Sequence, residues 1–319
     1  MNLKFLLPSI CLTFFCAKGL KAQESQLENY AAGILQYELR QHVEILASDS
    51  LQGREAGAPG GWMAGDYIAS CFEKYQLKPA FGNSYFQYID TLSDARNVIG
   101  IIEGTDSKQA AVVIGAHYDH HGTHHYAVYN GADDNASGVA ALLSIVKVMT
   151  AMERGQYRPK RTVIFIAYDS KELNMKGSEY YVNHPTVPLK QTVACLNMDM
   201  LGRIDAPPAA DTNYLMIVGA EKHKSNLKAI ADFVNYDKGL NLDIDYTFYG
   251  SPAFSDMFYR ISDQYNFGKH KIPVMYFTSG MHDDLWKPGD KYDRLSYLVL
   301  QKRTQLIFYV LWRVASGEL

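Results

Sequence analysis

Several side chains of the types that bind divalent metal ions stand just after short apolar runs of the sequence. The runs are residues 111–116, 163–168 and 193–198, and each has the length of a buried strand. The residues that follow them are His117, Asp119, Glu172 and Asp199. One imidazole among several carboxylates is an oxygen-rich ligand set that suits zinc or manganese, whereas a closed structural zinc site prefers sulfur. The pattern therefore predicts a metal centre of a non-structural kind.

A further acid, Asp134, lies in the glycine-bounded turn 131–138, ahead of a helical pattern. An acid at that point could simply cap the helix, because the first N–H groups of a helix favour a negative charge. A lone histidine after a strand could equally be an ordinary hydrogen-bonded side chain. However, the spacing of His117 and Asp119 lets the carboxylate take the ring N–H and fix its tautomer. Histidine and acidic residues recur at the ends of three apolar runs and at one helix start. This recurrence favours a shared metal ion over chance placement.

A sheet is needed to bring these run ends together. Helical spacing of apolar residues occurs near 27–49, 61–76, 136–151, 221–235 and 295–315. Other short apolar runs are 97–102, 215–218 and 274–277. Continuous apolar strands that alternate with helices are typical of a mostly parallel sheet covered on both faces. We therefore expect an α/β protein, a three-layer α/β/α sandwich with a mostly parallel, mixed central sheet, and a ligand site beyond the carboxyl ends of its strands.

Residues 1–22 have the pattern of a secretory signal peptide. Lys4 precedes an apolar run from Phe5 to Ala17, and Ala22 offers a small residue before a cleavage point. The run is too short for a permanent membrane anchor, and no later apolar run reaches membrane-spanning length. We expect an exported protein, periplasmic or extracellular, in which residues 23–319 form a single domain without a membrane partner.

Removal of residues 1–22 changes the charge and the cysteine content. Three lysines are lost, so 28 basic and 34 acidic side chains remain and the net charge becomes −6. This balance disfavours a nucleic-acid partner, because no surplus of basic residues neutralises phosphates. Only Cys71 and Cys195 remain. They could form a disulfide, but we favour two buried free thiols, since one lies in a helical pattern and the other in a strand pattern.

The ordered motifs resemble those of the co-catalytic zinc exopeptidases, a family that includes bacterial leucyl aminopeptidases, glutamate carboxypeptidase and glutaminyl cyclase. The resemblance covers nearly all of residues 23–319. The motifs that carry it are residues 46–54, 116–119, 131–138, 165–178, 197–203 and 284–290. The resemblance implies the zinc aminopeptidase fold, zinc as the cofactor, and a peptide or an amino-acid-like small molecule as the ligand.

The resemblance also implies a role for each site residue. His117 and Asp199 match ligands of one zinc ion, and Asp119 matches the carboxylate that orients His117. Asp134 matches the carboxylate that bridges two zinc ions and commonly precedes a cis peptide bond, while Glu172 matches a ligand of the second ion. In the family, water held between the ions attacks the peptide carbonyl, and a glutamate just before the Glu172 position accepts the proton.

Two positions depart from the family pattern. Lys171 stands at the position of the general base, and Trp286 stands where the family has a ligand histidine, four residues before Asp290. The second metal would retain only Asp134 and Glu172, which are too few ligands for tight zinc binding. An inward-pointing Lys171 could instead pair its ammonium with either carboxylate. We therefore expect one firmly held metal ion, or none.

Other arrangements stay open. His282 could reach the site through a loop shift, or it could bind substrate together with Trp286, in a pocket lined by residues 246–256 and 281–284. Lys171 could act as the base if a nearby cation lowered its pKa. A loop cluster could also hold a metal ion, although loop histidines are more often solvated. Its members are His120, His121, His124 and His125.

Three functions follow from this pattern. The first is an exported zinc aminopeptidase or dipeptidase that acts on peptide N-termini, with catalysis impaired by the lysine and the tryptophan. The second is a non-catalytic homologue that binds a peptide or amino acid in the inherited cleft, because the Trp286 indole can line a pocket but coordinates nothing. Glutaminyl cyclisation is the weakest, since that branch keeps both the histidine and the acid that Trp286 and Lys171 replace.

Overall fold

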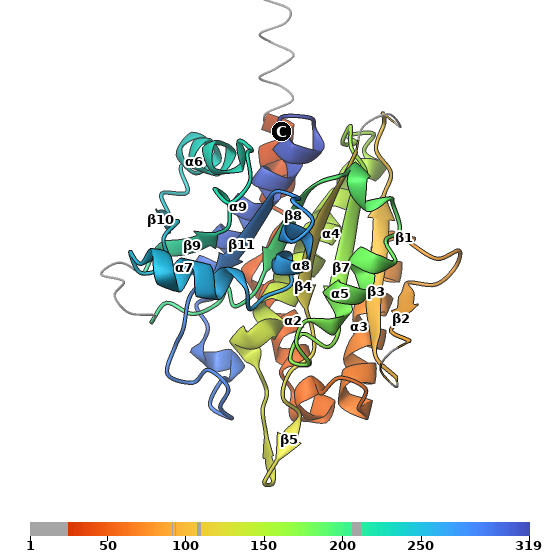
Figure 1. Cartoon of the computed structure of the whole chain (residues 1–319), viewed down its shortest axis with the longest axis vertical. Helices are drawn as coiled ribbons and strands as arrows, with labels where there is room; N and C mark the ends of the chain where they lie inside the picture. The colour runs from red at the N-terminus through yellow and green to blue at the C-terminus, as the bar shows by residue number, and fades with distance from the viewer. Residues whose placement is uncertain (1–24, 91, 93, 107–109, 206–211) are drawn as a thin grey trace, which may run out of the picture.

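The computed structural model describes residues 25–319, except for 91, 93, 107–109 and 206–211. The predicted signal peptide, residues 1–22, lies outside the described residues. The described chain folds into a central sheet with helices on both faces (Figure 1).

The sheet has nine strands in the order β1-β3-β7-β4-β8-β11-β9-β10, with β2 paired to the first part of β3. The strands are β1 (Lys78–Pro79), β2 (Phe86–Tyr88), β3 (Arg96–Ile102), β4 (Ala111–His117), β7 (Val163–Tyr168), β8 (Thr192–Met198), β9 (Tyr214–Val218), β10 (Asp243–Asp245) and β11 (Val274–Thr278). The central strands β7, β4, β8 and β11 are parallel to one another. β10 is parallel to β9, while β3 and β9 join the centre antiparallel. The prediction of a mixed sheet with a parallel centre is confirmed.

Helices cover both faces of this sheet, as Figure 1 shows. One face carries α2 (Gln36–Leu46), α3 (Pro59–Lys74), α4 (Gly138–Arg154), α6 (Leu227–Asp237) and α9 (Tyr297–Ala315). The other carries α5 (Lys176–Asn183), α7 (Pro252–Tyr259) and α8 (Gln264–Gly268). A small hairpin of β5 (Thr123–His124) and β6 (Ala127–Val128) extends below the sheet. The predicted three-layer sandwich is therefore present.

The central strands are apolar throughout because both of their faces are buried. In β7, Val163 and Phe165 belong to the core under α4 and α9. Ile164 and Ile166 belong to the core under α5 and α8. Successive side chains of a strand point to opposite faces, so a sheet covered on both sides needs apolar residues at every position. This is why the sequence shows continuous apolar runs rather than alternation.

The N-terminal helical region differs from the prediction of one helix over 27–49. The chain turns at residues 32–33, and α2 begins at Gln36. Gly33 lies in this turn, and glycine is among the weakest helix formers because it loses the most backbone entropy in a helix. The glycine-rich segment that follows is a short 3-10 turn, Asp49–Arg54. Periodicity alone did not show this break.

The expectation that no later segment reaches membrane-spanning length was wrong. The continuous helical stretch Ala132–Arg154 has 23 residues and is apolar enough by composition to cross a membrane. However, 89% of its most apolar window is buried inside the protein. A helix that is apolar on all sides is typical of the centre of a large core, and here the stretch packs between the sheet and neighbouring helices.

Both remaining cysteines are free and buried, as predicted. Cys71 lies on α3 and Cys195 on β8. Burial raises the pKa of both thiols, so neither is poised as a nucleophile.

Candidate metal centre

The sheet brings the predicted ligands to a single edge. β4, β7 and β8 are parallel neighbours, so their carboxyl ends lie together. His117 is the last residue of β4, and Asp199 directly follows β8. Glu172 lies in the loop after β7, and Asp134 lies in the helical turn Ala132–Ser137 that leads into α4.

Three of these residues form what we call the first donor group: His117, Asp134 and Asp199. They offer donor atoms that all lie within 4.8 Å of one another. His117 Nε2 is 3.3 Å from Asp134 Oδ1 and 3.2 Å from Asp199 Oδ1, and all three side chains are buried. Neither carboxylate oxygen of Asp134 has a hydrogen-bond partner among the described residues. Because a buried carboxylate without hydrogen bonds is costly, the group fits a divalent cation such as zinc.

The charges of the first donor group depend on one another. Burial and Lys171 would lower the pKa of His117, but the neighbouring carboxylates, Asp199 foremost, raise it well above its usual value. Burial would raise the pKa of Asp134, yet Lys171 and the histidines hold it well below its usual range. The carboxylates therefore stabilise the protonated, positively charged form of the His117 ring. A metal ion that binds there must displace the proton, so its affinity should fall in acid.

Asn135 ties the two ligand-bearing strand ends together. Its side-chain nitrogen donates to the carbonyls of Met198 at 2.9 Å and His117 at 3.3 Å, and its oxygen accepts from Met200 N at 2.9 Å. The Asp134–Asn135 peptide bond is cis, as the resemblance implied. The sequence pattern assigned no role to Asn135, although its place inside the 131–138 motif was a usable signal.

Arg54 positions the loops on the other side of Asp134. The guanidinium is fully buried and donates to four carbonyl oxygens at 2.6–2.9 Å. The acceptors are the main-chain oxygens of Leu46, Tyr118, Asn130 and Gly131. One buried side chain thus joins the end of α2 to the segment after β4 and to the turn that carries Asp134. The sequence analysis noted Arg54 only as part of a motif.

Asp290 holds the same turn from the opposite side. Its carboxylate accepts hydrogen bonds from Asp133 N at 2.9 Å and from Asp134 N at 3.0 Å. Burial and the Asp133 carboxylate raise the pKa of Asp290 to about 7. The aspartate that served only as a motif marker therefore fixes the backbone of a metal ligand.

Asp199 also has a support that the sequence analysis missed. Ser262 Oγ donates to Asp199 Oδ2 at 2.6 Å, and the Asn197 side chain donates to Ser262 Oγ at 2.9 Å. Ser262 lies in the loop before α8, 63 residues from Asp199. No motif marks it, because its role depends on a contact between distant segments.

Asp119 serves the site differently from the prediction. His117 Nδ1 lies 3.1 Å from the main-chain oxygen of Asp119 and 3.5 Å from its carboxylate. The hydrogen bond that orients the ring is therefore made by the backbone. The carboxylate instead accepts from Lys171 N and Glu172 N, each at 3.0 Å. Each N–H group donates to a different carboxylate oxygen, so Asp119 positions the loop after β7.

Lys171 points into the site, as expected from the sequence. Its Nζ is 2.9 Å from Glu172 Oε1 and 3.7 Å from Asp134 Oδ1. Burial would lower the pKa of Lys171, but Asp134, Asp199 and Glu172 together raise it well above its usual value. The ammonium therefore keeps its proton among these carboxylates, which opposes a role as general base.

The two residues expected to bind substrate differ in exposure. The His282 side chain is fully buried, with Nε2 3.6 Å from Asp133 Oδ2, and neither group of metal donors includes it. Trp286 is 56% exposed, and its ring meets the His121 ring edge-on at 6.5 Å. Of the pair, Trp286 presents surface to a ligand. The two segments expected to line the pocket meet where Met281 N donates to Tyr249 Oη.

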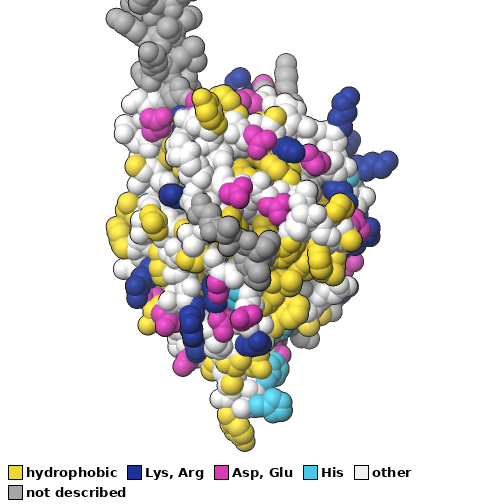
Figure 2. Space-filling model, turned by 90° about the vertical axis from the view of Figure 1, so that its left-hand side faces the viewer, with side chains coloured by type: hydrophobic (Ala, Val, Ile, Leu, Met, Phe, Trp, Pro, Cys, Tyr) yellow, Lys and Arg dark blue, Asp and Glu magenta, His cyan; other side chains and the backbone are white. Residues whose placement is uncertain are grey.

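The histidine cluster divides into two parts. His124 and His125 are exposed on the β5–β6 hairpin, at the lower end of the molecule, where Figure 2 shows histidines on the surface. His120 and His121 turn inward instead. Together with Glu172 they offer donor atoms within 4.8 Å of one another. We call His120, His121 and Glu172 the second donor group.

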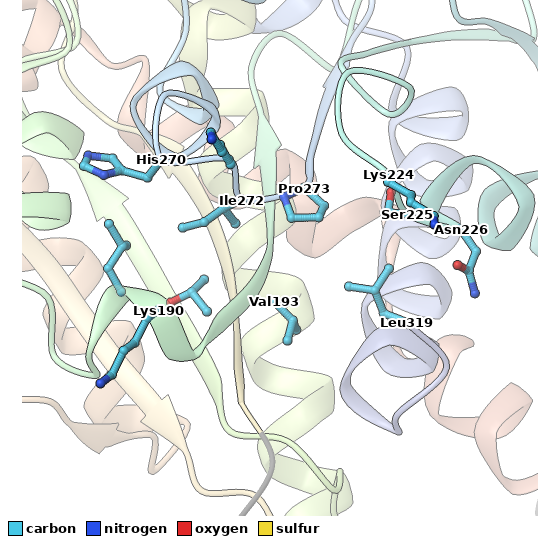
Figure 3. Close-up of a pocket in the computed structure, with 12 residues that line it drawn as sticks. Lys190, Val193, Lys224, Ser225, Asn226, His270, Ile272, Pro273 and Leu319 are labelled. Atoms are coloured by element: carbon cyan, nitrogen blue, oxygen red, sulfur yellow. The ribbon is translucent and has the colours of Figure 1, made fainter.

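A large cavity lies at the other edge of the sheet (Figure 3). It has a volume of about 810 Å³, and its lining includes Thr192 and Val193 at the start of β8 and Ile272 and Pro273 ahead of β11. Both pairs lie at the amino ends of their strands, whereas the metal donor Asp199 follows the carboxyl end of β8. The cavity is therefore separate from the metal centre.

A comparison with protein families matches residues 97–311 to Peptidase family M28. This match spans well over half of the chain and contains both donor groups, so the chain belongs to this family. The resemblance to zinc exopeptidases that the motifs indicated is confirmed.

Individual relatives agree with this assignment. A glutamate carboxypeptidase 2 homolog of Caenorhabditis briggsae is 30% identical over 164 residues, which are 48% of this chain and 20% of the relative. The chain thus matches about a fifth of that relative's length. LapA aminopeptidase of Legionella pneumophila has a TM-score of 0.73 at 20% identity, over 92% of this chain and 75% of that one. BSAP, a zinc aminopeptidase from Bacillus subtilis, has a TM-score of 0.69 at 14% identity, over 89% and 96%. At these identities the structural likeness shows the fold.

Proposed function

We propose that this chain is an exported zinc exopeptidase of the aminopeptidase type, which acts on or binds peptide N-termini and turns over slowly. The first donor group carries the proposal. Three buried donors converge within 4.8 Å, and the carboxylate oxygens of Asp134 have no other hydrogen-bond partner among the described residues. Zinc bound there would polarise a peptide carbonyl and lower the pKa of water.

Slow turnover follows from the residue at the base position. Lys171 is held as an ammonium by the carboxylates around it, so it cannot accept a proton as a glutamate would. Loss of a general base typically lowers a rate by about 10²–10⁴-fold. The ammonium can still donate a hydrogen bond and offset negative charge near Asp134. This supports weak hydrolysis rather than the full activity of the family.

A second candidate function is ligand binding without turnover. The exposed Trp286 indole, beside the site and in contact with His121, supports it. An indole can stack on a ligand or line its pocket, and the paired Lys171 and Glu172 would supply both charges for a peptide or an amino acid.

Hydrolysis assays with defined metals separate the two candidates. We expect the purified protein to contain zinc, and to hydrolyse chromogenic amino-acid amides slowly with added Zn²⁺, Co²⁺ or Mn²⁺. A chelator should abolish the activity. His117→Ala is the matched negative variant, because it removes the only imidazole of the first donor group.

Each outcome of that assay is informative. Turnover that the chelator and His117→Ala both abolish supports the peptidase. Zinc bound with no turnover, together with amino-acid binding in calorimetry, supports the binding protein. A chain that binds no divalent ion contradicts the peptidase, and amino-acid binding in calorimetry then decides the second candidate.

Export is the remaining part of the proposal and rests on the signal pattern of residues 1–22. N-terminal sequencing of the protein produced with its full leader should show a chain that begins at Gln23, recovered outside the cytoplasm. A cytoplasmic chain that begins at Met1 would contradict it.

A further inference from the structure

The second donor group lies beside the first, next to Asp134. His121 Nε2 is 3.7 Å from Glu172 Oε2, and His120 Nδ1 is 3.7 Å from Asp134 Oδ2. The His120 and His121 rings lie 4.6 Å apart. Two imidazoles and the Glu172 carboxylate therefore converge, and Asp134 Oδ2 adjoins them at His120. Such a mixed nitrogen and oxygen set is typical of transition-metal sites.

Three of the ring nitrogen atoms of this group have no hydrogen-bond partner among the described residues. Both ring nitrogens of His120 and Nε2 of His121 are buried and unpaired among the described residues, as are both oxygens of Asp134. His120 is only 1% exposed. Buried polar atoms normally find partners, because leaving one unpaired costs about 1–3 kcal/mol. Several such atoms around one point indicate a missing ligand.

Neighbouring groups hold the two histidines in place. His120 N donates to the main-chain oxygen of Arg54 at 3.0 Å, which fixes the segment after β4. The His121 ring meets Tyr129 edge-on at 6.3 Å and Trp286 at 6.5 Å. Trp286 occupies the sequence position of the family's ligand histidine, so the indole that replaces the ligand packs against a different imidazole.

We propose that His120, His121 and Glu172 hold a second divalent transition-metal ion, with Asp134 shared between this ion and the one in the first donor group. The site replaces the histidine lost at Trp286 with imidazoles from the loop after β4. It goes beyond the single zinc ion of the proposed function, and it requires of that function only the Asp134 carboxylate. Zn²⁺ and Co²⁺ suit its ligands.

Lys171 sets the strength of this site. Its ammonium binds Oε1 of Glu172 at 2.9 Å, which leaves Oε2 facing His121. A dication beside that ammonium is repelled at short range. The second ion should therefore bind more weakly than the first, and removal of the lysine charge should strengthen it by at least about tenfold.

Titration of the chelator-treated protein with Zn²⁺ in a calorimeter tests the proposal. The unmodified protein should bind two equivalents, one tightly and one more weakly. His121→Ala should bind only the tight equivalent, whereas His125→Ala, which changes an exposed histidine of the same segment, should keep both. His121 is partly exposed, so this change is expected to be tolerated. Thermal unfolding of the chelated variants checks the fold.

A second variant keeps the test decisive if His121→Ala unfolds. Lys171→Met should tighten only the weaker equivalent, by at least about tenfold. Visible absorption of bound Co²⁺ should then show a second, imidazole-containing site that appears at lower metal concentration. One equivalent in the unmodified protein, two in His121→Ala, or an unchanged second affinity in Lys171→Met would overturn the proposal. Amide hydrolysis plays no part in these readouts, so failure of the peptidase function would leave them intact.

Discussion

The first and second donor groups differ in how their negative charge is balanced. In the first, His117 lies between Asp134 and Asp199, and all three residues match the family motifs. In the second, Glu172 divides its oxygens between the Lys171 ammonium and His121. By the resemblance, the first group matches family ligands throughout, whereas beside the second group Lys171 stands at the base position and Trp286 at a ligand position.

This contrast shows that loss of a ligand need not leave a bare position. The carboxylates Asp134 and Glu172 remain buried, and buried carboxylates require nearby positive charge or hydrogen bonds. Lys171 supplies a fixed positive charge, and the ring nitrogens of His120 and His121 can coordinate a metal ion. We therefore expect the two donor groups to differ mainly in their affinity for a metal ion and in their ability to accept a proton. Their total charges should differ less.

The largest expected effect comes from restoring the family's residues beside the second donor group. Lys171→Glu combined with Trp286→His restores the base and the ligand histidine. We expect amide hydrolysis to rise by about 10²–10⁴-fold, the usual contribution of a general base, and more metal per chain to survive dialysis. Steady-state kinetics and elemental analysis measure both quantities. If neither changes, the alignment of these two positions with the family is wrong.

The next effect is on the pH dependence of stability, and it concerns a buried carboxyl group near the first donor group. Burial raises the pKa of Asp263 from its usual value to about 7. An acid with a raised pKa keeps its proton in the folded protein after the unfolded chain has released it. Its contribution to stability is thus complete below about pH 4 and is lost as the pH rises through about 7, by up to about 4 kcal/mol.

Asp263→Asn should flatten that part of the pH profile. Urea denaturation in the presence of a chelator, at intervals from pH 4 to pH 8, would measure the free energy of unfolding. Asp243→Asn, at an exposed position of β10, should keep the profile of the unmodified protein. An equally steep fall in Asp263→Asn would show that other groups cause it.

A substitution of Asp119 tests which of the two donor groups its carboxylate supports. Its carboxylate accepts the N–H groups of Lys171 and Glu172, while the backbone orients His117. We therefore expect Asp119→Asn to weaken the second ion by about 10–100-fold, the range for residues that position metal ligands, with a smaller change for the first ion. Zinc calorimetry gives both constants. The reverse order would restore the predicted role of the carboxylate as the partner of His117.

The smallest expected effect is on the metal affinity of the first donor group alone. Ser262→Ala removes the 2.6 Å hydrogen bond to Asp199 Oδ2. A hydrogen bond to a charged group contributes about 1.5–3 kcal/mol, and we expect the lower end of that range, which lowers the affinity for the first ion about tenfold. Competition with a chromogenic chelator measures this affinity. Ser255→Ala on α7 is the control and should have no effect on either ion.

The strands of the core could be predicted closely from the sequence. β4, β7, β8, β9 and β11 begin and end within one residue of the apolar runs that predicted them. This accuracy has a physical cause, because residues buried on both faces must all be apolar and so leave a clear signal. Helix starts were less accurate. α6 begins at Leu227, six residues after the predicted start and directly after Ser225 and Asn226, which are residue types that favour a helix N-cap.

The first donor group was also predictable, because parallel neighbours deliver their carboxyl ends to one edge of a sheet. The supporting contacts were not. Ser262 reaches Asp199 across 63 residues, and Arg54 reaches Gly131 across 77. Such contacts depend on how loops pack, and no local spacing in the sequence encodes them.

The sequence alone determined the layered sheet, the ligands at the ends of β4 and β8, and the two departures at Lys171 and Trp286. Only the tertiary structure decided that His120 and His121 face Glu172 while His124 and His125 stay exposed. Sequence patterns report burial and periodicity within an element. The direction of a loop side chain is set by the neighbours that pack around it, and here these come from the segments that carry Arg54, Tyr129 and Trp286.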